Sequence, residues 1–140
     1  MEPMAKQLSD AQQSGVYRLV CSPEEVERAA RDAGLAVFRI DIGHARNKKT
    51  FLAKIADALQ FPNWFGGNWD ALNDLLTDLE WLTTKNGYVL IFEKGENNPL
   101  FENAKEVLQS AAEYWKTEGR PFWALFEISD SADDLPLWPT

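Results

Sequence analysis

Three carboxylates in one short segment are the strongest candidates for a functional site in this sequence. Asp70, Asp74 and Asp78 recur at four-residue intervals behind an aromatic and glycine-rich loop at residues 61–68. A four-residue interval keeps side chains on one side of a helix, so these carboxylates would form an acidic stripe with Asp78 at its edge. Such a stripe suits a cationic group on a partner. No loop has the ligand spacing of a metal site, so no metal is expected.

Other residue types that carry out catalysis are sparse. His44 is the only histidine, and no serine or cysteine nucleophile pattern lies near it. Cys21 is the only cysteine and is most simply a small buried apolar residue. The phosphate-binding loop, the dinucleotide fingerprint, G-x-S-x-G and H-E-x-x-H are all absent. We therefore expect no cofactor and no enzymatic activity, while an enzyme that uses carboxylates stays an alternative because acids are plentiful.

The helix that would carry the stripe is predicted over residues 69–82, with Asn68 as its N-cap. Its core face would consist of leucines at helical spacing, which are Leu72, Leu75, Leu76 and Leu79. Like charges four residues apart cost a helix about 0.2–0.5 kcal/mol, which applies to Asp70 and Asp74. A solvated acidic face explains Asp70, because an acid is favourable in a first helical turn, but explains Asp74 poorly. The helix alone leaves open whether this face binds a partner or is only solvated.

The loop at residues 61–68 (FPNWFGGN) precedes this helix. Gly66 and Gly67 allow a sharp turn, because glycine reaches backbone angles that other residues resist. Phe61 and Phe65 are expected to fill the core. Trp64 lies between an asparagine and the glycine pair and is a better candidate for exposure, where tryptophan is a favoured anchor for partners.

The overall charge narrows the class of partner. The chain has 140 residues, with 14 Lys and Arg against 22 Asp and Glu, which gives a net charge of −8. Direct binding to nucleic acid or to an anionic membrane is disfavoured, because both surfaces need clustered cations. A basic protein partner fits the charge better. Solubility alone is the simpler explanation of the same charge.

Several features indicate a cytoplasmic protein. A single cysteine rules out an internal disulfide and fits a reducing compartment. Residues 1–15 are polar and lack the apolar segment of a signal peptide. No apolar run approaches the roughly 20 residues that cross a bilayer.

The periodicity of apolar residues predicts an α/β domain with a mainly parallel sheet, because strands alternate with helices. Strands are expected at residues 16–21, 35–42, 87–93 and 122–128, and helices at 23–33, 48–59, 69–82 and about 100–116. The last two strands are nearly continuous apolar runs, which predicts that they are neighbours covered on both faces. Residues 1–15 are expected to be disordered, and the acidic tail at 129–140 to be loose.

Residues 61–77 resemble the signature of the barstar family, the intracellular inhibitors of the ribonuclease barnase. The shared pattern is a proline, two aromatic residues, glycine, asparagine, Asp-Ala-Leu and a second aspartate four residues after the first. The order of elements also matches over residues 36–128. The resemblance implies a short, mainly parallel sheet packed with helices, with residues 16–35 as an extra N-terminal strand and helix.

The resemblance implies an inhibitor or immunity protein that blocks a basic ribonuclease through the acidic helix and the preceding loop. Asp74 corresponds to the acid that fills the phosphate site of the enzyme. The partner-binding residues implied by position are Trp64, Gly66, Asn68, Asp70, Asn73, Asp74 and Thr77.

Two positions depart from the family. Asn73 stands where the family often has an aromatic residue. Lys105 aligns with a further acidic contact on the later helix, and Glu102 and Glu106 flank it as candidate substitutes. The partner is therefore not required to be a close relative of barnase, and a binding module for another basic protein, or a nucleic-acid mimic, is the alternative function.

Overall fold

The computed structural model describes residues 3–62, 67–84, 86–128 and 135–139. Its strands are β1 (Val16–Leu19), β2 (Ala36–Asp41), β3 (Tyr88–Glu93), β4 (Phe122–Phe126) and β5 (Leu137–Trp138). They form one sheet in the order β2-β3-β4-β1-β5, and every pair in it is parallel. The helices are α1 (Met4–Leu8), η1 (Ala11–Gln13), α2 (Pro23–Asp32), α3 (Lys48–Leu59), α4 (Trp69–Leu76) and α5 (Phe101–Thr117). None of the helices in the described ranges is long and apolar enough to cross a membrane.

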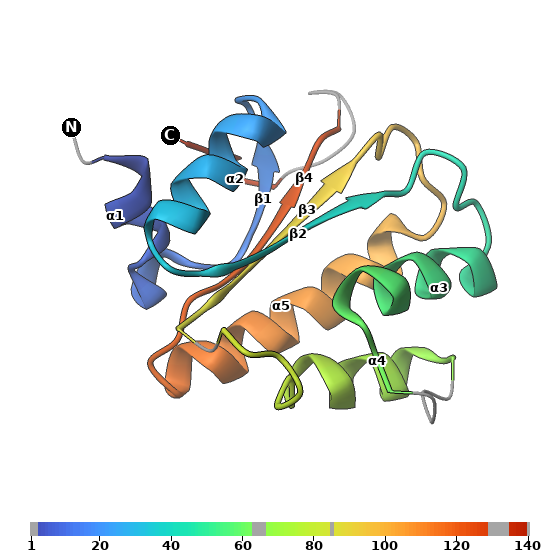
Figure 1. The fold of residues 1–140 in the computed structure, drawn as a ribbon. Coiled ribbons are helices and arrows are strands. Elements are labelled where there is room, and N and C mark those ends of the chain that lie inside the picture. The colour runs from blue at the N-terminus through green and yellow to red at the C-terminus, as the bar shows by residue number, and fades with distance from the viewer. Residues whose placement is uncertain (1–2, 63–66, 85, 129–134, 140) are drawn as a thin grey trace.

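Helices cover both faces of this sheet. Figure 1 shows α1 and α2 on one face and α3, α4 and α5 on the other. The predicted α/β class and the parallel pairing of the two apolar strands are confirmed, since β3 and β4 are neighbours in register from Tyr88↔Phe122 to Phe92↔Phe126. Both strands lie inside the sheet, which explains why their sequences have no polar alternation.

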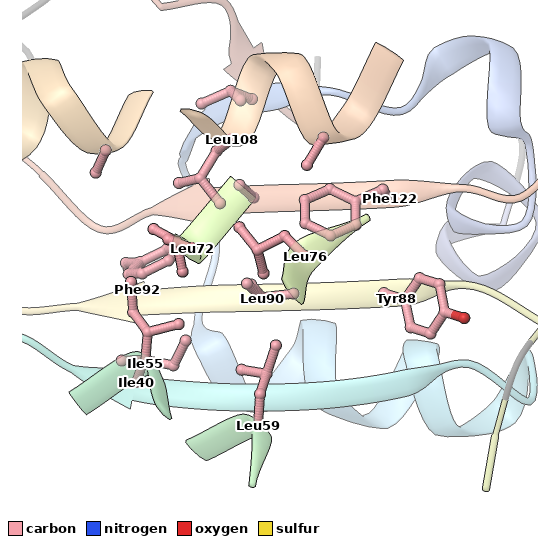
Figure 2. Packing of buried hydrophobic residues seen from close by; sticks show 14 of the residues in the cluster. Ile40, Ile55, Leu59, Leu72, Leu76, Tyr88, Leu90, Phe92, Leu108 and Phe122 are labelled. Carbon is pink, nitrogen blue, oxygen red and sulfur yellow. The ribbon is translucent and has the colours of Figure 1, made fainter. Parts of the chain in front are cut away.

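The core between the sheet and α3, α4 and α5 supports the acidic helix. Leu72 and Leu76 of α4 are fully buried against Leu90 and other residues of the central strands (Figure 2). Leu108 contributes from α5 to the same cluster. Because strand residues alternate between faces, the odd-numbered residues of β3 and β4 are left to a second core on the opposite face.

That second core corrects the expectation of a disordered N-terminus. Leu8 is completely buried among the side chains of the second core, and its carbonyl accepts a 2.9 Å hydrogen bond from the indole nitrogen of Trp123. Met4 packs against the same cluster. The prediction was wrong for residues 4–8, because the face of β4 that Leu8 covers is apolar and must be buried, and residues 11–13 form the short helix η1.

The C-terminal tail is likewise ordered over residues 135–139. β5 pairs with β1 through Leu19↔Trp138, and the Trp138 ring lies 5.3 Å from that of Trp123. The expectation of a loose tail was therefore wrong for this part, and its acidic stretch at 129–134 lies outside the described residues. β1 lies between β4 and β5, so the strand within residues 16–35 belongs to the same sheet as the strands that follow it.

Candidate functional site

The start of α4 follows the sequence prediction. Asn68 caps the helix, because its side-chain oxygen accepts a 2.7 Å hydrogen bond from the backbone nitrogen of Ala71. Asp70 lies in the first turn, where a negative charge is favoured by the helix dipole. The eight-residue helix therefore has a fixed beginning directly after the loop.

The end of α4 comes earlier than predicted. The helix stops at Leu76 rather than at residue 82, and Thr77 is its C-cap. The hydroxyl of Thr77 donates to the carbonyl of Asn73 at 2.9 Å, and Leu79 has a left-handed φ of 55°. This turn still buries Leu79 completely. Asp78 consequently lies beyond the helix and does not continue its stripe.

The side chain of Trp81 also lies elsewhere than the predicted helix would place it. A helix through residue 82 would place it on the side of the acidic stripe. Instead its indole nitrogen donates to the carbonyl of Leu59 at 2.8 Å, and its ring meets Phe61 edge-on at 5.8 Å. Trp81 therefore joins the turn after α4 to the end of α3.

Five of the seven predicted contact residues lie in the described part of the chain. Asn68, Asp70 and Asp74 are exposed, whereas Asn73 and Thr77 are half-buried. All five lie on α4 or at its caps. Trp64 and Gly66 lie outside the described residues, so their predicted role stays a prediction.

The aspartates of this surface are unpaired. Within the described ranges, no ion pair joins Asp70, Asp74 or Asp78 to a lysine or arginine. Some of the protein's cations pair with acids elsewhere, as at Arg39, which contacts three glutamates. The α4 surface therefore presents uncompensated negative charge to solvent.

Helix α5 extends this surface with Glu106, one of the two glutamates that the resemblance offered as a contact, but the grooves between the helices were not predicted. A groove of about 280 Å³ between α4 and α5 is lined by Asp70 and Asn73 on one side and by Glu106 on the other. A second groove of about 380 Å³ lies at the other end of the same helix pair, beside Thr77 and Tyr114. Nothing in the local sequence signals this, because α4 and α5 are far apart in the chain.

Lys105 does not contribute to the α4–α5 groove. Its ammonium lies 3.3 Å from the carboxylate of Glu102 and 5.6 Å from the ring centre of Phe101. Glu106 is the one of the two flanking glutamates that lines the groove. The charge change at position 105 is therefore offset by Glu102, while Glu106 adds an acid to the α4 surface.

The remaining reactive side chains do not form a site. His44 is exposed, and no group of three or more His, Cys, Asp or Glu side chains suited to a metal ion occurs in the residues searched, which are the described ones. Burial raises the pKa of the Cys21 thiol, and the charge of Glu25 acts in the same direction. A raised pKa lowers the thiolate fraction, which makes this cysteine a poor nucleophile.

Comparison with protein-family models matches residues 35–127 to the model described as barstar (barnase inhibitor). The match runs from just before β2 to just after β4 and includes α3, α4 and α5. It leaves α1, α2, β1 and β5 outside. Comparison with curated proteins finds no match.

Proposed function

Because this chain belongs to the barstar family of barnase inhibitors, we propose that it binds a basic ribonuclease and blocks the enzyme's active site. The contact would be made by α4 and the loop before it. The observation that supports this most directly is the pair of exposed, unpaired carboxylates of Asp70 and Asp74 on a helix held firmly against α5. Such an inhibitor would act inside the cell, as an immunity protein that protects it from the nuclease.

The active-site chemistry of a ribonuclease explains why carboxylates would be enough to bind and block it. A ribonuclease must present cationic side chains to the phosphates of RNA, and a fixed carboxylate can take the place of a phosphate there. Asp74 is proposed to fill the phosphate site. Complementary charge also accelerates the encounter of the two proteins.

The other contacts surround this carboxylate. Asn68, Asp70, Asn73 and Thr77 are proposed to contact the enzyme from α4 and its caps. Trp64 and Gly66 are proposed to contact it from the loop. A rigid helix serves such recognition, because less conformational freedom is lost on binding.

Replacing Asp74 by alanine tests this function. Asp74 is exposed and lies in the last turn of α4, where a negative charge is unfavourable. The free energy of unfolding should therefore stay unchanged or rise by a few tenths of a kcal/mol. Binding to a basic ribonuclease, measured by titration calorimetry, should weaken by at least about 2 kcal/mol, the usual threshold for a dominant contact.

Asp57→Ala is the matched control. Asp57 is an exposed acid in the last turn of α3, away from α4, and removing it changes the net charge by the same amount. Its stability effect should resemble that of Asp74→Ala, and its binding should be unchanged. Equal binding by both variants would contradict the proposed contact, and unfolding of Asp74→Ala alone would show a structural role instead.

A further inference from the structure

The two edges of the sheet are protected to different degrees. β5 forms one edge, where its two residues lie between Pro136 and Pro139. Prolines and a very short strand both prevent another strand from joining an edge. β2 forms the other edge, and its six residues contain no proline. Of these two edges, that of β2 therefore leaves room for a further strand.

The backbone of β2 has unused hydrogen-bonding groups along its outer edge. The amides of Ala36 and Ile42 donate to carbonyls on the β3 side, at 3.0 Å each. Because alternate residues of a strand point their N–H and C=O groups to opposite sides, those of Val37, Arg39 and Asp41 point away from β3. They have no backbone partner in the described part of the chain. These donors and acceptors therefore line the open edge at the spacing of a β-strand.

The charged side chains of β2 do not guard this edge. Edge strands commonly carry free charges that repel another strand. Here the guanidinium of Arg39 is bound by three glutamates of α2 and β3, at distances of 2.7, 2.8 and 3.3 Å. Asp41 bonds to the ammonium of Lys94 at 3.1 Å and to the amide of Gly43 at 2.9 Å. Both charges are held by partners within the protein and do not oppose an added strand.

A groove of about 270 Å³ runs along the same edge. Its lining includes three consecutive residues of β2, Ala36, Val37 and Phe38. Side chains of consecutive strand residues point to opposite faces, so a groove that touches all three follows the edge of the strand. Trp81 and Leu82 add apolar surface, and none of the described lining residues is charged. The groove therefore suits an uncharged, apolar side chain.

A second copy of this chain does not fit the open edge. α2 and α3 both contact β2, from opposite faces of the sheet (Figure 1). Paired strands lie about 4.8 Å apart, whereas packed helices need about 8–10 Å. Two copies joined through β2 would bring a helix of each copy closer together than helices can pack, on both faces. The occupant must therefore be an extended segment with no helices packed on it.

The charges beside the edge specify the polar side of such a segment. On the α2 face, the ion pairs of Arg31 and Arg39 include three glutamates, so carboxylates outnumber guanidinium groups there. The side chain of Glu24 is 63% exposed. A cationic side chain suits this face and the net charge of −8. Because an added strand points alternate side chains to the two faces, alternating apolar and basic residues fit best.

We propose that the β2 edge binds an extended segment of a partner protein, in which apolar and basic residues alternate, as an added strand of the sheet. Main-chain hydrogen bonds to Val37, Arg39 and Asp41 would supply the affinity. An apolar side chain would enter the groove beside Phe38, and a basic one would lie near Glu24. This surface shares no residue with the proposed ribonuclease contact and does not depend on that function.

Hydrogen exchange of the full chain tests the proposal with the peptide acetyl-Lys-Val-Lys-Val-Lys-Val-Lys-amide. In the free protein, the amides of Val37, Arg39 and Asp41 should exchange faster than those of Phe38 and Ile40, which face β3. At ten times its Kd, the peptide should slow exchange of the three outward amides about tenfold. NMR at physiological salt follows each amide separately.

Two N-methylated forms of the peptide distinguish strand pairing from attraction between charges. One form carries N-methyl groups on its valines and the other on its lysines, and both keep every side chain. Alternate amides of an added strand point toward β2. One form should therefore bind at least about tenfold more weakly than the other, as for the loss of two net hydrogen bonds.

Two tryptophan variants test the groove. Thr83 is an exposed residue of its lining, so Thr83→Trp should fill the groove and weaken peptide binding at least about tenfold. Thr117→Trp places the same ring at an exposed position at the end of α5 and should leave binding unchanged. Circular dichroism and thermal unfolding establish that both variants fold.

Each result decides for or against the added strand. Protection of the outward amides, together with unequal binding of the two methylated peptides, would support it. A peptide that shifts the signals of Asp70 and Asp74 without protecting those amides binds the acidic helix by charge alone, which would overturn the proposal. Equal binding of the methylated forms, or binding unchanged by Thr83→Trp, would overturn it as well, whether or not the chain inhibits a ribonuclease.

Discussion

The indole nitrogen of Trp115 donates a 2.7 Å hydrogen bond to the carbonyl oxygen of Leu76, which joins α5 to the last residue of α4. The last four carbonyls of a helix have no partner within it. In α4 the carbonyls of Asn73, Asp74 and Leu75 are satisfied by the turn that follows, and that of Leu76 by Trp115. The last carbonyl of the acidic helix is therefore hydrogen-bonded by a side chain from another helix.

Replacing Trp115 by phenylalanine should destabilise the protein by about 1–3 kcal/mol, because it leaves the buried Leu76 carbonyl without a donor. Chemical denaturation measures the loss. The control is Tyr114→Phe, because Tyr114 is 43% exposed and should change stability by no more than about 0.5 kcal/mol. Equal stability of the two variants would show that the bond to Leu76 contributes little.

Leu8→Ala tests the ordered N-terminal segment. Leu8 is fully buried on the face opposite α4, so this truncation should cost about 2–5 kcal/mol of stability. The exposed Gln12 provides a control, and Gln12→Ala should lie within about 0.5 kcal/mol of the unchanged protein. If Leu8→Ala were as stable as Gln12→Ala, residues 4–8 would not be part of the folded unit.

Binding to a basic ribonuclease should depend on salt through its association rate. The charges of Asp70 and Asp74 act over distances that salt screens beyond roughly 8–10 Å at physiological ionic strength. Association should therefore slow steeply as salt is added, while dissociation responds less. Stopped-flow kinetics measures both rates. Asp70→Asn should flatten the salt dependence of association, and a rate that is flat for the unchanged chain would argue against recognition by charge.

Helix α2 should contribute a pH-dependent part of the stability. The hydrogen bond from Arg31 holds the pKa of Glu27 below its usual 4.5, against the effect of its partial burial. Because the pKa is lowered by folding, this stabilisation is complete above about pH 4.5 and is lost as pH falls through the lower, folded-state pKa.

Arg31→Gln checks this expectation. At neutral pH the variant should lose about 0.3–0.5 kcal/mol, typical of an exposed pair four residues apart on a helix. In acid, where Glu27 is protonated in every state, the difference should vanish. Arg28→Gln removes the same charge from an exposed position of α2 and should show no such pH dependence. Urea denaturation across the acid range measures both variants.

Features that depend on neighbouring residues were predictable from the sequence. Ser22 caps α2 by accepting from the backbone nitrogen of Glu25, and Asn68 caps α4 in the same way. The uninterrupted apolar runs of β3 and β4 correctly placed both strands in the interior of a parallel sheet. A cap depends on a hydrogen bond between residues three apart in the chain. The interior position of a strand depends on the apolar character of its own residues on both faces.

Features that depend on distant residues were not predictable. The leucine periodicity continues through Leu79, yet α4 ends at Leu76, where Trp115 completes its hydrogen bonding from another helix. The position of Glu106 beside Asp70 likewise follows only from the packing of α5 on α4. Helix α1 has a single turn, which is too short to show a period, and its order comes from burial of Leu8.

The location of the two chain ends bears on how the protein can be attached to something else. Figure 1 shows α1, close to the N-terminal end, on the same face of the sheet as α2 and across the sheet from α4. The second core fixes residues near each end, Leu8 and Trp138, to that side. A tether at either end, whether to a solid support or to a fused domain, would therefore leave the acidic helix pointing away from the attachment and free to meet its partner.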